Sequence, residues 1–284
     1  MNVAVGLGRL SRHVRLATWF GRDADGALLA DHLASSHVAV VPGSDGASHT
    51  SRAQVEFNDA GSASYVFDLE WRLTSLVSEA QPIVVHTGSI AAALKPGADD
   101  VLKALRAMHA AGSTISFDPN MRPQIIGPAD DVRPTTEQFV CLADIVKVSD
   151  EDLAWLYPGI APIDSAQQWA GGGLAPDPRQ PGPALVVLTK GADGVTAITR
   201  SGELEMAAPA VEVADTVGAG DAFMAGLLHA LWDDGLLTDP SALANINHRD
   251  LRRGLTVATQ TAAIALSRPG ADPPWSWELL SQAC

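Results

Sequence analysis

The chain has 284 residues, of which 46% are apolar and 18% charged, and a formal net charge of −14. This length suits one large α/β domain, alone or with a small appendage, and the composition is ordinary for a protein with a buried core. The negative charge disfavours binding to DNA or an anionic membrane through a general basic field. Two cysteines, Cys141 and Cys284, favour a reducing, cytoplasmic setting. We expect neither a membrane helix nor a signal peptide.

Short β-branched runs alternate with longer amphipathic stretches along most of the chain. Alternation of this kind predicts a mostly parallel sheet with helices on both faces, and ligands bound beyond the carboxyl ends of the strands. The expected strands are Arg15–Trp19, Ile83–Thr87, Thr114–Asp118, Ile145–Val148 and Ala184–Thr189. The expected helices are Ala24–Ser35, Gly97–Ala111, Thr135–Ala143, Asp150–Leu156 and Ser165–Ala170.

Two segments interrupt this alternation. Val38–Phe67 consists of short strand-like runs separated by Gly, Ser, Asp and Asn, which indicates a small β appendage or lid. Gly194–Val213 also predicts strands, joined by a turn at Arg200–Gly202. Gly171–Pro183 is rich in Gly and Pro and is expected to be a surface loop.

The last third of the chain predicts two helices, Ala219–Trp232 and Leu251–Ser267. The first of them is opened by the string DTVGAGD at Asp215–Asp221. Small residues at 218–220 let backbone N–H groups approach an anion, and a helix start adds partial positive charge. Asp221 lies in the first helical turn, where it could receive a hydroxyl proton during phosphoryl transfer. A Gly-rich helix start with a favourable carboxylate is the simpler interpretation.

DTVGAGDAF resembles the signature of ribokinase-like (PfkB-type) carbohydrate kinases, and the resemblance extends over nearly the whole chain, most closely to fructokinases. It implies a ribokinase-like α/β fold with a mostly parallel central sheet, helices on both faces and a small β lid. It divides the chain into the start of the kinase body at 1–37, the lid at 38–68, and the rest of the body with the ATP site at 69–284. It also implies that Asp221 is the catalytic base and that Gly218, Ala219 and Gly220 form an anion hole. Asp215 and Thr216 are then expected to organise the loop and are candidates for binding a monovalent cation.

Two N-terminal segments also resemble the family. Asn2–Leu10 is similar to its first helix, where the Asn reaches the sugar, and Phe20–Gly26 is similar to its Gly-x-Asp-x-x-Gly turn, which makes Asp23 a sugar-binding candidate. Taken alone, Asn2 is equally well explained as a helix cap, and Asp23 is better explained as the cap of the helix after it.

FDPNMRP at Phe117–Pro123 directly follows an expected strand. Its carboxylate, amide and guanidinium groups suit hydroxyl and phosphate binding, and the resemblance to fructokinases makes Asn120 and Arg122 substrate-binding candidates. A tight Asp-Pro turn is the alternative.

KVSDED at Lys147–Asp152 resembles the family's Asn-x-x-Glu motif, with Ser149 for Asn and Asp152 for Glu. The resemblance places Lys147 and Ser149 at ATP and Asp152 at Mg²⁺ through water; a helix cap is the alternative. TKGADG at Thr189–Gly194 resembles the family's nucleotide loop, although a turn between two strands also explains it. SRPGA at Ser267–Ala271 resembles the family's segment beside the adenine and monovalent-cation sites. The ATP-binding candidates also include Thr189, Gly191, Asp193, Gly194, Gly218 and Gly220.

The chain departs from the family at its start. The family has a strand ahead of the helix at Asn2, with an Asp for the sugar and a following Gly-Gly pair, and none of these has a counterpart here. Either the start codon is assigned too late or the chain is truly shortened. We expect a form extended upstream to fold better or bind sugar more tightly, because that strand lies inside the sheet.

These patterns predict a carbohydrate kinase that transfers phosphate from MgATP to a primary hydroxyl of a small sugar. Fructose is the leading substrate, followed by 2-keto-3-deoxygluconate, ribose and a nucleoside. K⁺ is a candidate cofactor, and a homodimer formed through the lid is a candidate assembly, without nucleic acid or membrane partners. The alternative of another class is a catalytically impaired paralogue that binds nucleotide or sugar. A P-loop kinase or a Rossmann dehydrogenase is disfavoured because the fingerprints are absent or incomplete.

Overall fold

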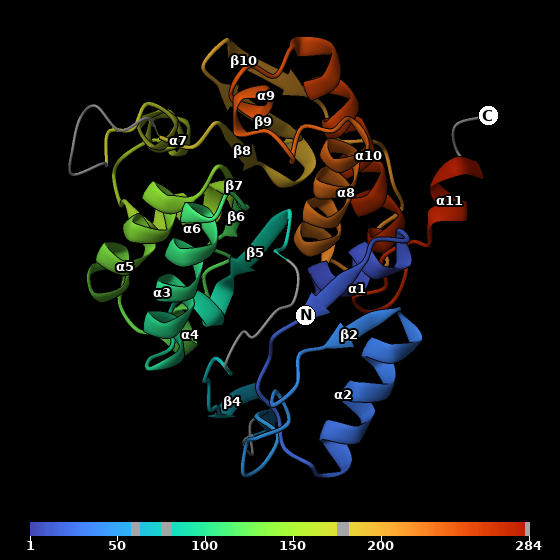
Figure 1. Ribbon diagram of the computed structural model, residues 1–284. Coiled ribbons are helices and arrows are strands. Elements are labelled where there is room, and N and C mark those ends of the chain that lie inside the picture. Colours follow the sequence, from blue (N-terminus) through green and yellow to red (C-terminus); the bar gives the residue numbers. More distant parts are fainter. Residues whose placement is uncertain (58–62, 75–80, 175–181, 282–284) are drawn as a thin grey trace.

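The computed structural model describes residues 1–57, 63–74, 81–174 and 182–281 (Figure 1). The helices are α1 (Asn2–Arg9), α2 (Ala24–Ser35), α3 (Gly97–Ala110), α4 (Pro123–Ile126), α5 (Ala129–Leu142), α6 (Asp150–Leu156), α7 (Pro162–Ala170), α8 (Ala219–Asp233), α9 (Pro240–Ala244), α10 (His248–Leu266) and α11 (Ser276–Ser281). The strands are β1 (Val14–Leu16), β2 (Val38–Val40), β3 (Arg52–Phe57), β4 (Ala63–Asp68), β5 (Val84–Gly88), β6 (Thr114–Asp118), β7 (Ile145–Ser149), β8 (Leu185–Thr189), β9 (Val195–Thr199) and β10 (Gly202–Met206). Two 3₁₀ turns, η1 (Ser89–Ala92) and η2 (Gly191–Asp193), follow β5 and β8.

The central sheet has six strands in the order β10-β9-β8-β7-β6-β5. Strands β5 to β8 run parallel, whereas β9 and β10 add an antiparallel edge. The predicted α/β architecture with a mostly parallel sheet is therefore confirmed. Parallel neighbours bring the carboxyl ends of β6, β7 and β8 to one edge of the sheet, where the ligand-binding motifs were expected.

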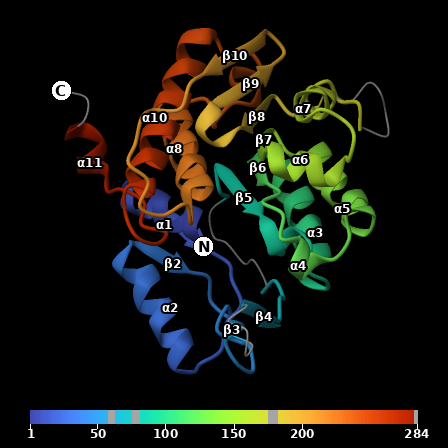
Figure 2. The same cartoon turned by 180° about the vertical axis from the view of Figure 1, so that it is seen from behind.

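Both faces of the sheet are covered by helices, with α1, α8 and α10 on one side and α3, α5, α6 and α7 on the other (Figures 1 and 2). Successive side chains of a strand point to opposite faces, so Ile145 packs into the core beneath α8 while Val146 packs into the core beneath α5. Burial on both faces explains why β8 reads as an unbroken apolar run.

A second, two-stranded sheet joins β1 and β2 in parallel, with Val14 opposite Val38. Strands β3 and β4 form an antiparallel hairpin within the segment expected to be a lid; residues 58–62 of that segment lie outside the described residues. Among the described residues, β5 pairs only with β6, so the central sheet ends at β5 and β1 is not part of it.

Side-chain caps mark several helix starts: Asp23 caps α2 and Ser149 caps α6, and both helices have the predicted bounds. Helix α5 was predicted from Thr135 but begins at Ala129 and contains Pro134, so the proline did not mark its start. Residues 175–181 of the expected surface loop lie outside the described residues. In the part of the chain that the structure describes, no helix is long and apolar enough to cross a membrane.

Candidate active site

Helix α8 begins with a turn of residues that have little or no side chain. Gly218, the N-cap, has a φ of +77°, which only glycine adopts readily. A Cβ at this position would lie 2.6 Å from the Cβ of Ala271, so the chain also leaves no room for a side chain there. The amides of a first helical turn have no acceptor within the helix and carry partial positive charge. Gly218–Gly220, called the anion turn below, therefore suits a phosphate or a developing phosphoryl charge.

Asp221 directly follows the anion turn, and its Oδ2 accepts a hydrogen bond of 2.8 Å from Nδ2 of Asn2. Asn2 is the first residue of α1, which packs against α8 where Gly6 meets Ala225; a Cβ on Gly6 would lie 2.6 Å from the Cβ of Ala225. The close approach of the two helices therefore brings two predicted site residues, 219 positions apart in sequence, into contact.

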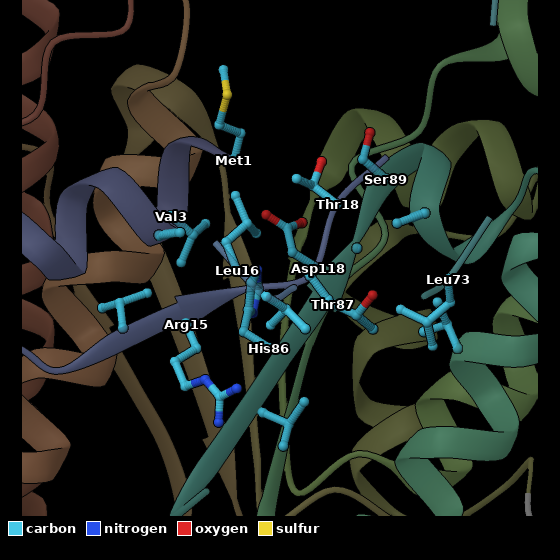
Figure 3. A pocket seen from close by; sticks show the side chains of 18 of the residues that line it. Met1, Val3, Arg15, Leu16, Thr18, Leu73, His86, Thr87, Ser89 and Asp118 are labelled. Carbon is cyan, nitrogen blue, oxygen red and sulfur yellow. The ribbon is translucent and has the colours of Figure 1, made fainter. Parts of the chain in front are cut away.

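Asn2 and Asp221 line a cavity of about 900 Å³, which is also lined by Asp118 at the end of β6 and by Asn120 and Arg122 from the loop after β6. Figure 3 looks into this cavity, with Asp118 and other lining side chains labelled. The cavity extends between β1 and β5, the two strands that end their respective sheets. Four of the predicted residues, Asn2, Asn120, Arg122 and Asp221, thus share one space.

A buried ion pair lies beneath the anion turn. Nζ of Lys147 on β7 donates to Oδ2 of Asp118 on β6 at 2.9 Å, and the side chains are 5% and 2% exposed. A Cβ on Gly220 would be 2.9 Å from this Nζ, so the ammonium group lies against the anion turn. The other oxygen of Asp118, Oδ1, is buried without a hydrogen-bond partner.

Burial and the charge of the partner residue act in opposite directions on the pKa of Asp118 and on that of Lys147. Burial raises the pKa of Asp118 to about 6, against the lowering effect of Lys147. Burial also opposes the charge on Lys147, but the carboxylates of Asp118, Asp152 and Asp221 outweigh it and raise the pKa of Lys147. Lys147 was predicted to bind ATP; the structure places it under the anion turn, with its ammonium group on Asp118.

Asp152 links the KVSDED motif to the FDPNMRP loop. Its Oδ1 accepts from the backbone N of Met121 at 2.9 Å, and its backbone N donates to Oγ of Ser149 at 3.1 Å. Ser149 therefore serves as the helix cap that the sequence offered as an alternative. Asp152 fixes the loop that carries Asn120 and Arg122.

The loop after β6 is folded tightly on itself. Asn120 has a φ of +40°, and Nη1 of Arg122 donates to the carbonyl oxygens of Asn120 (3.2 Å) and Met121 (2.7 Å). These hydrogen bonds hold the guanidinium group at the edge of the cavity. The group also carries N–H donors on Nε and Nη2.

Asp23 is not brought to this cavity. Its Oδ1 accepts from Thr50 Oγ1 (2.6 Å) and Gly26 N (2.8 Å), and its Oδ2 accepts from Thr50 N (2.8 Å). These hydrogen bonds, led by the Thr50 hydroxyl, lower the pKa of Asp23 well below its ordinary value. The arrangement matches the helix-cap alternative for this residue.

The expected nucleotide loop lies at the carboxyl end of β8, where Thr189 is opposite Ser149 of β7. Gly191 and Gly194 have φ values of +54° and +89°, and Asp193 ends the 3₁₀ turn between them. The residues of this loop do not line the cavity around Asp221. They lie at the same edge of the central sheet, where the parallel strands end. Thr189 donates to the carbonyl of Val148 at 3.3 Å.

Asp215 organises the approach to the anion turn. Its Oδ1 accepts from Val217 N (3.0 Å) and its Oδ2 from Gly270 N (2.8 Å), and these backbone hydrogen bonds lower its pKa. The carbonyl of Thr216 accepts from Ala219 N at 3.3 Å. The carboxylate of Asp215 and the carbonyl of Thr216 offer hard oxygen donors, which are chemically suited to a monovalent cation.

Sequence reasoning missed two features. Asp118 was seen as part of a motif but not as the partner of Lys147, because the two residues lie 29 positions apart. His86 of β5 also lines the cavity; its Nδ1 is 3.1 Å from Ser116 Oγ, and burial lowers its pKa to about 4, so it is neutral at pH 7. Nothing in the spacing of the eight histidines pointed to it.

The geometry places a carboxylate, Asp221, beside a helix-start turn suited to phosphate and at the edge of a cavity. Comparison with known proteins shows the class of protein. The model of the pfkB family of carbohydrate kinases matches residues 1–278, so this chain belongs to that family and is a sugar kinase. It is 32% identical to a fructokinase from Escherichia coli over 278 residues, covering 95% of this chain and 85% of the relative.

Solved structures give the same result. A double mutant of fructokinase from Vibrio cholerae O395, in a form with fructose, ADP and potassium ion, is similar with a TM-score of 0.78 and 27% identity, covering 99% of this chain and 88% of the other. Aminoimidazole riboside kinase from Salmonella enterica, complexed with aminoimidazole riboside and an ATP analogue, gives a TM-score of 0.76 and 26% identity, covering 99% and 88%. The resemblance to ribokinase-like kinases is confirmed.

Proposed function

We propose that the protein is a fructokinase that transfers the terminal phosphoryl group of MgATP to a primary hydroxyl of fructose. The observation that carries this proposal is the placement of Asp221, held by Asn2, between the anion turn and the cavity. The fructokinases among the relatives support fructose over other sugars.

In the proposed mechanism, Asp221 receives the hydroxyl proton as the sugar oxygen bonds to the γ-phosphorus and the bond from phosphorus to ADP breaks. Asn2 occupies Oδ2 of Asp221 at 2.8 Å, which leaves Oδ1 for the substrate hydroxyl. The amides of the anion turn stabilise the negative charge on the transferred group. Lys147 contributes a positive charge directly beneath that turn.

Asn2, Asn120 and Arg122 form the proposed sugar side of the site, because their side chains reach the same cavity as Asp221. Asp23 was predicted to join them and would have to exchange its contacts with Thr50 to do so. The guanidinium of Arg122 combines hydroxyl recognition with attraction to the phosphate.

The proposed nucleotide side follows β7 and β8, with Ser149 and the loop at Thr189–Gly194. Mg²⁺ keeps most of its water and takes few protein ligands, so Asp152 with the phosphates suits it through water. In the described part of the chain no three acidic, His or Cys side chains converge closely enough to hold a metal ion by themselves. Asp215 and Thr216 are the proposed residues for K⁺.

The substrate is tested with an assay of ADP release from MgATP against fructose, 2-keto-3-deoxygluconate, ribose and aminoimidazole riboside. The last compound is included because its kinase shares this fold. Turnover with fructose above the others supports the proposal. If another sugar of the panel is turned over in preference, that sugar replaces fructose as the proposed substrate. Binding of sugar or nucleotide without turnover supports the catalytically impaired paralogue. We also propose a homodimer through the β3–β4 hairpin; a monomer by light scattering at micromolar concentration would contradict it.

A further inference from the structure

The loop between α10 and α11, residues 267–275, lies directly against the anion turn and is called the C-terminal loop below. Ala271 of this loop is so close to Gly218 that a Cβ on the glycine would be 2.6 Å from the alanine Cβ. Gly270 N donates to Asp215 Oδ2 at 2.8 Å, and the carbonyl of Leu266 accepts from Ala214 N at 2.8 Å. A displacement of the C-terminal loop would therefore move the anion turn.

Arg9, in the last turn of α1, holds the C-terminal loop from the opposite side. Its Nη1 donates to the carboxylate of Asp272 and to the carbonyl of Pro273, the latter at 2.7 Å. Its guanidinium carbon lies 5.3 Å from the centre of the Trp275 ring. The Arg9 side chain is 12% exposed and that of Asp272 is 43% exposed, so the guanidinium group of this clamp is largely buried while its carboxylate partner faces solvent.

Further contacts keep the clamped loop in one shape. Arg268 pairs with Asp272 at 3.4 Å and also with Glu278. Glu278 Oε2 accepts from Trp275 N at 2.8 Å. The loop is therefore held as a unit between Arg9 and Asp215.

Helix α1 thus touches the site at both ends: Asn2 at its start binds Asp221, and Arg9 at its end holds the loop that touches Gly218. We propose that Arg9 is a positioning residue for phosphoryl transfer, which fixes the C-terminal loop so that the anion turn and Asp221 keep their relative placement. This inference rests on the proposed phosphoryl transfer at that turn.

The chain offers a matched control, Arg12, three residues further on. Its Nη2 pairs with Asp233, its Nε donates to His229 Nδ1 at 2.9 Å, and its guanidinium carbon lies 5.6 Å from the centre of the Trp232 ring. The side chains of Arg12 and Asp233 are 16% and 40% exposed, against 12% and 43% for Arg9 and Asp272. Arg12 lines the far end of the cavity, but it contacts α8 on the order of 12 Å or more along the helix from Asp221 and does not contact the C-terminal loop in these interactions. Its substitution therefore controls for the loss of a similar arginine without disturbing the anion turn.

Arg9→Met and Arg12→Met are compared for turnover, KM and melting temperature. We expect both to lower the melting temperature, but only Arg9→Met to lower kcat, by about tenfold, because small displacements of catalytic groups are costly. The KM values of Arg9→Met for sugar and MgATP should change by less than about threefold, since Arg9 does not line the cavity. Arg9→Lys and Asp272→Asn, which disturb the fold less, should lower kcat in the same direction.

Hydrogen exchange of the same variants gives a readout that needs no turnover. Amides of residues 218–221 and 267–275 should exchange faster in Arg9→Met than in Arg12→Met. Equal kcat losses in both variants, or equal exchange at these amides, would overturn the positioning role. Inactive wild-type protein with the expected exchange difference would instead contradict the proposed function, while leaving the clamp supported.

Discussion

The anion turn and the Asp118–Lys147 pair meet at Gly220, the last residue of the turn, but they are built in different ways. The anion turn uses backbone amides from consecutive residues, and its chemistry needs only small side chains and a helix start. The ion pair uses two side chains from neighbouring strands, buried almost completely. In the proposed mechanism the turn contacts the transferred phosphoryl group, whereas the ion pair lies beneath the turn as a charged support.

This difference also decides what the sequence reveals. The anion turn is a contiguous string, so the sequence predicted the helix that begins in it and suggested Asp221 as the base, a role that stays a proposal. The pair depends on the register of β6 against β7, which places residues 29 positions apart side by side. Substitutions in the two features should therefore have different consequences. A change in the anion turn should lower kcat, whereas a change in the ion pair should lower the free energy of unfolding.

Asp221→Asn should have the largest effect, a loss of about 10²- to 10⁴-fold in kcat, because asparagine does not accept the hydroxyl proton. ATP binding should change little, since the variant keeps the shape of the side chain. The measurement is ADP release at saturating substrate, with Asp31→Asn, an exposed position on α2, as the control. A variant that keeps most of its turnover would remove Asp221 from the role of base.

Lys147→Met should lower the free energy of unfolding by about 3–5 kcal/mol, because it leaves the Asp118 carboxylate buried without its partner. The double variant Lys147→Met/Asp118→Leu should recover part of this loss, since no lone charge remains. Urea unfolding at pH 7 measures both. Equal stability of the single variant and the wild type would show that the pair is not a structural support.

Gly218→Ala should lower kcat by about tenfold, because a Cβ would strike Ala271 and displace the anion turn. Gly235→Ala at the other end of α8 is the matched control: its φ is +72°, close to the +77° of Gly218, but no atom lies within 4 Å of the new Cβ. Both variants should suffer a similar backbone strain of about 1 kcal/mol. If both lose kcat equally, strain rather than the contact with Ala271 is responsible.

Local patterns predicted most elements and the contiguous part of the site. Helices α2 and α6 and strand β6 have the predicted bounds, because capping residues and β-branched runs act locally. The separation of β1 and β2 from the central sheet could not be predicted, since pairing between distant strands depends on the whole fold. Asp23 shows the same limit: whether it caps a helix or binds sugar depends on Thr50, 27 residues away.

The smallest effect we expect is a pH dependence carried by Asp118. Burial raises its pKa to about 6 in the folded protein, above the ordinary 3.8, so the folded state binds this proton more tightly. The free energy of unfolding contributed by Asp118 should therefore fall as pH rises from about 4 to 6. His86 acts in the opposite direction, because its pKa is lowered to about 4 from 6.5.

The difference between the wild type and Asp118→Asn isolates the contribution of Asp118 from that of His86. Their free energies of unfolding, measured in urea from pH 4 to 7 at constant ionic strength, should differ least near pH 4, where folded Asp118 is protonated and resembles Asn. They should diverge toward higher pH, with the wild type losing stability relative to the variant, because the buried carboxylate costs stability when ionised. Lys147 stays charged over this range because its pKa is raised, so it adds no slope of its own. Parallel curves would mean that Asp118 titrates alike in the folded and unfolded chain, and that Lys147 compensates its burial in full.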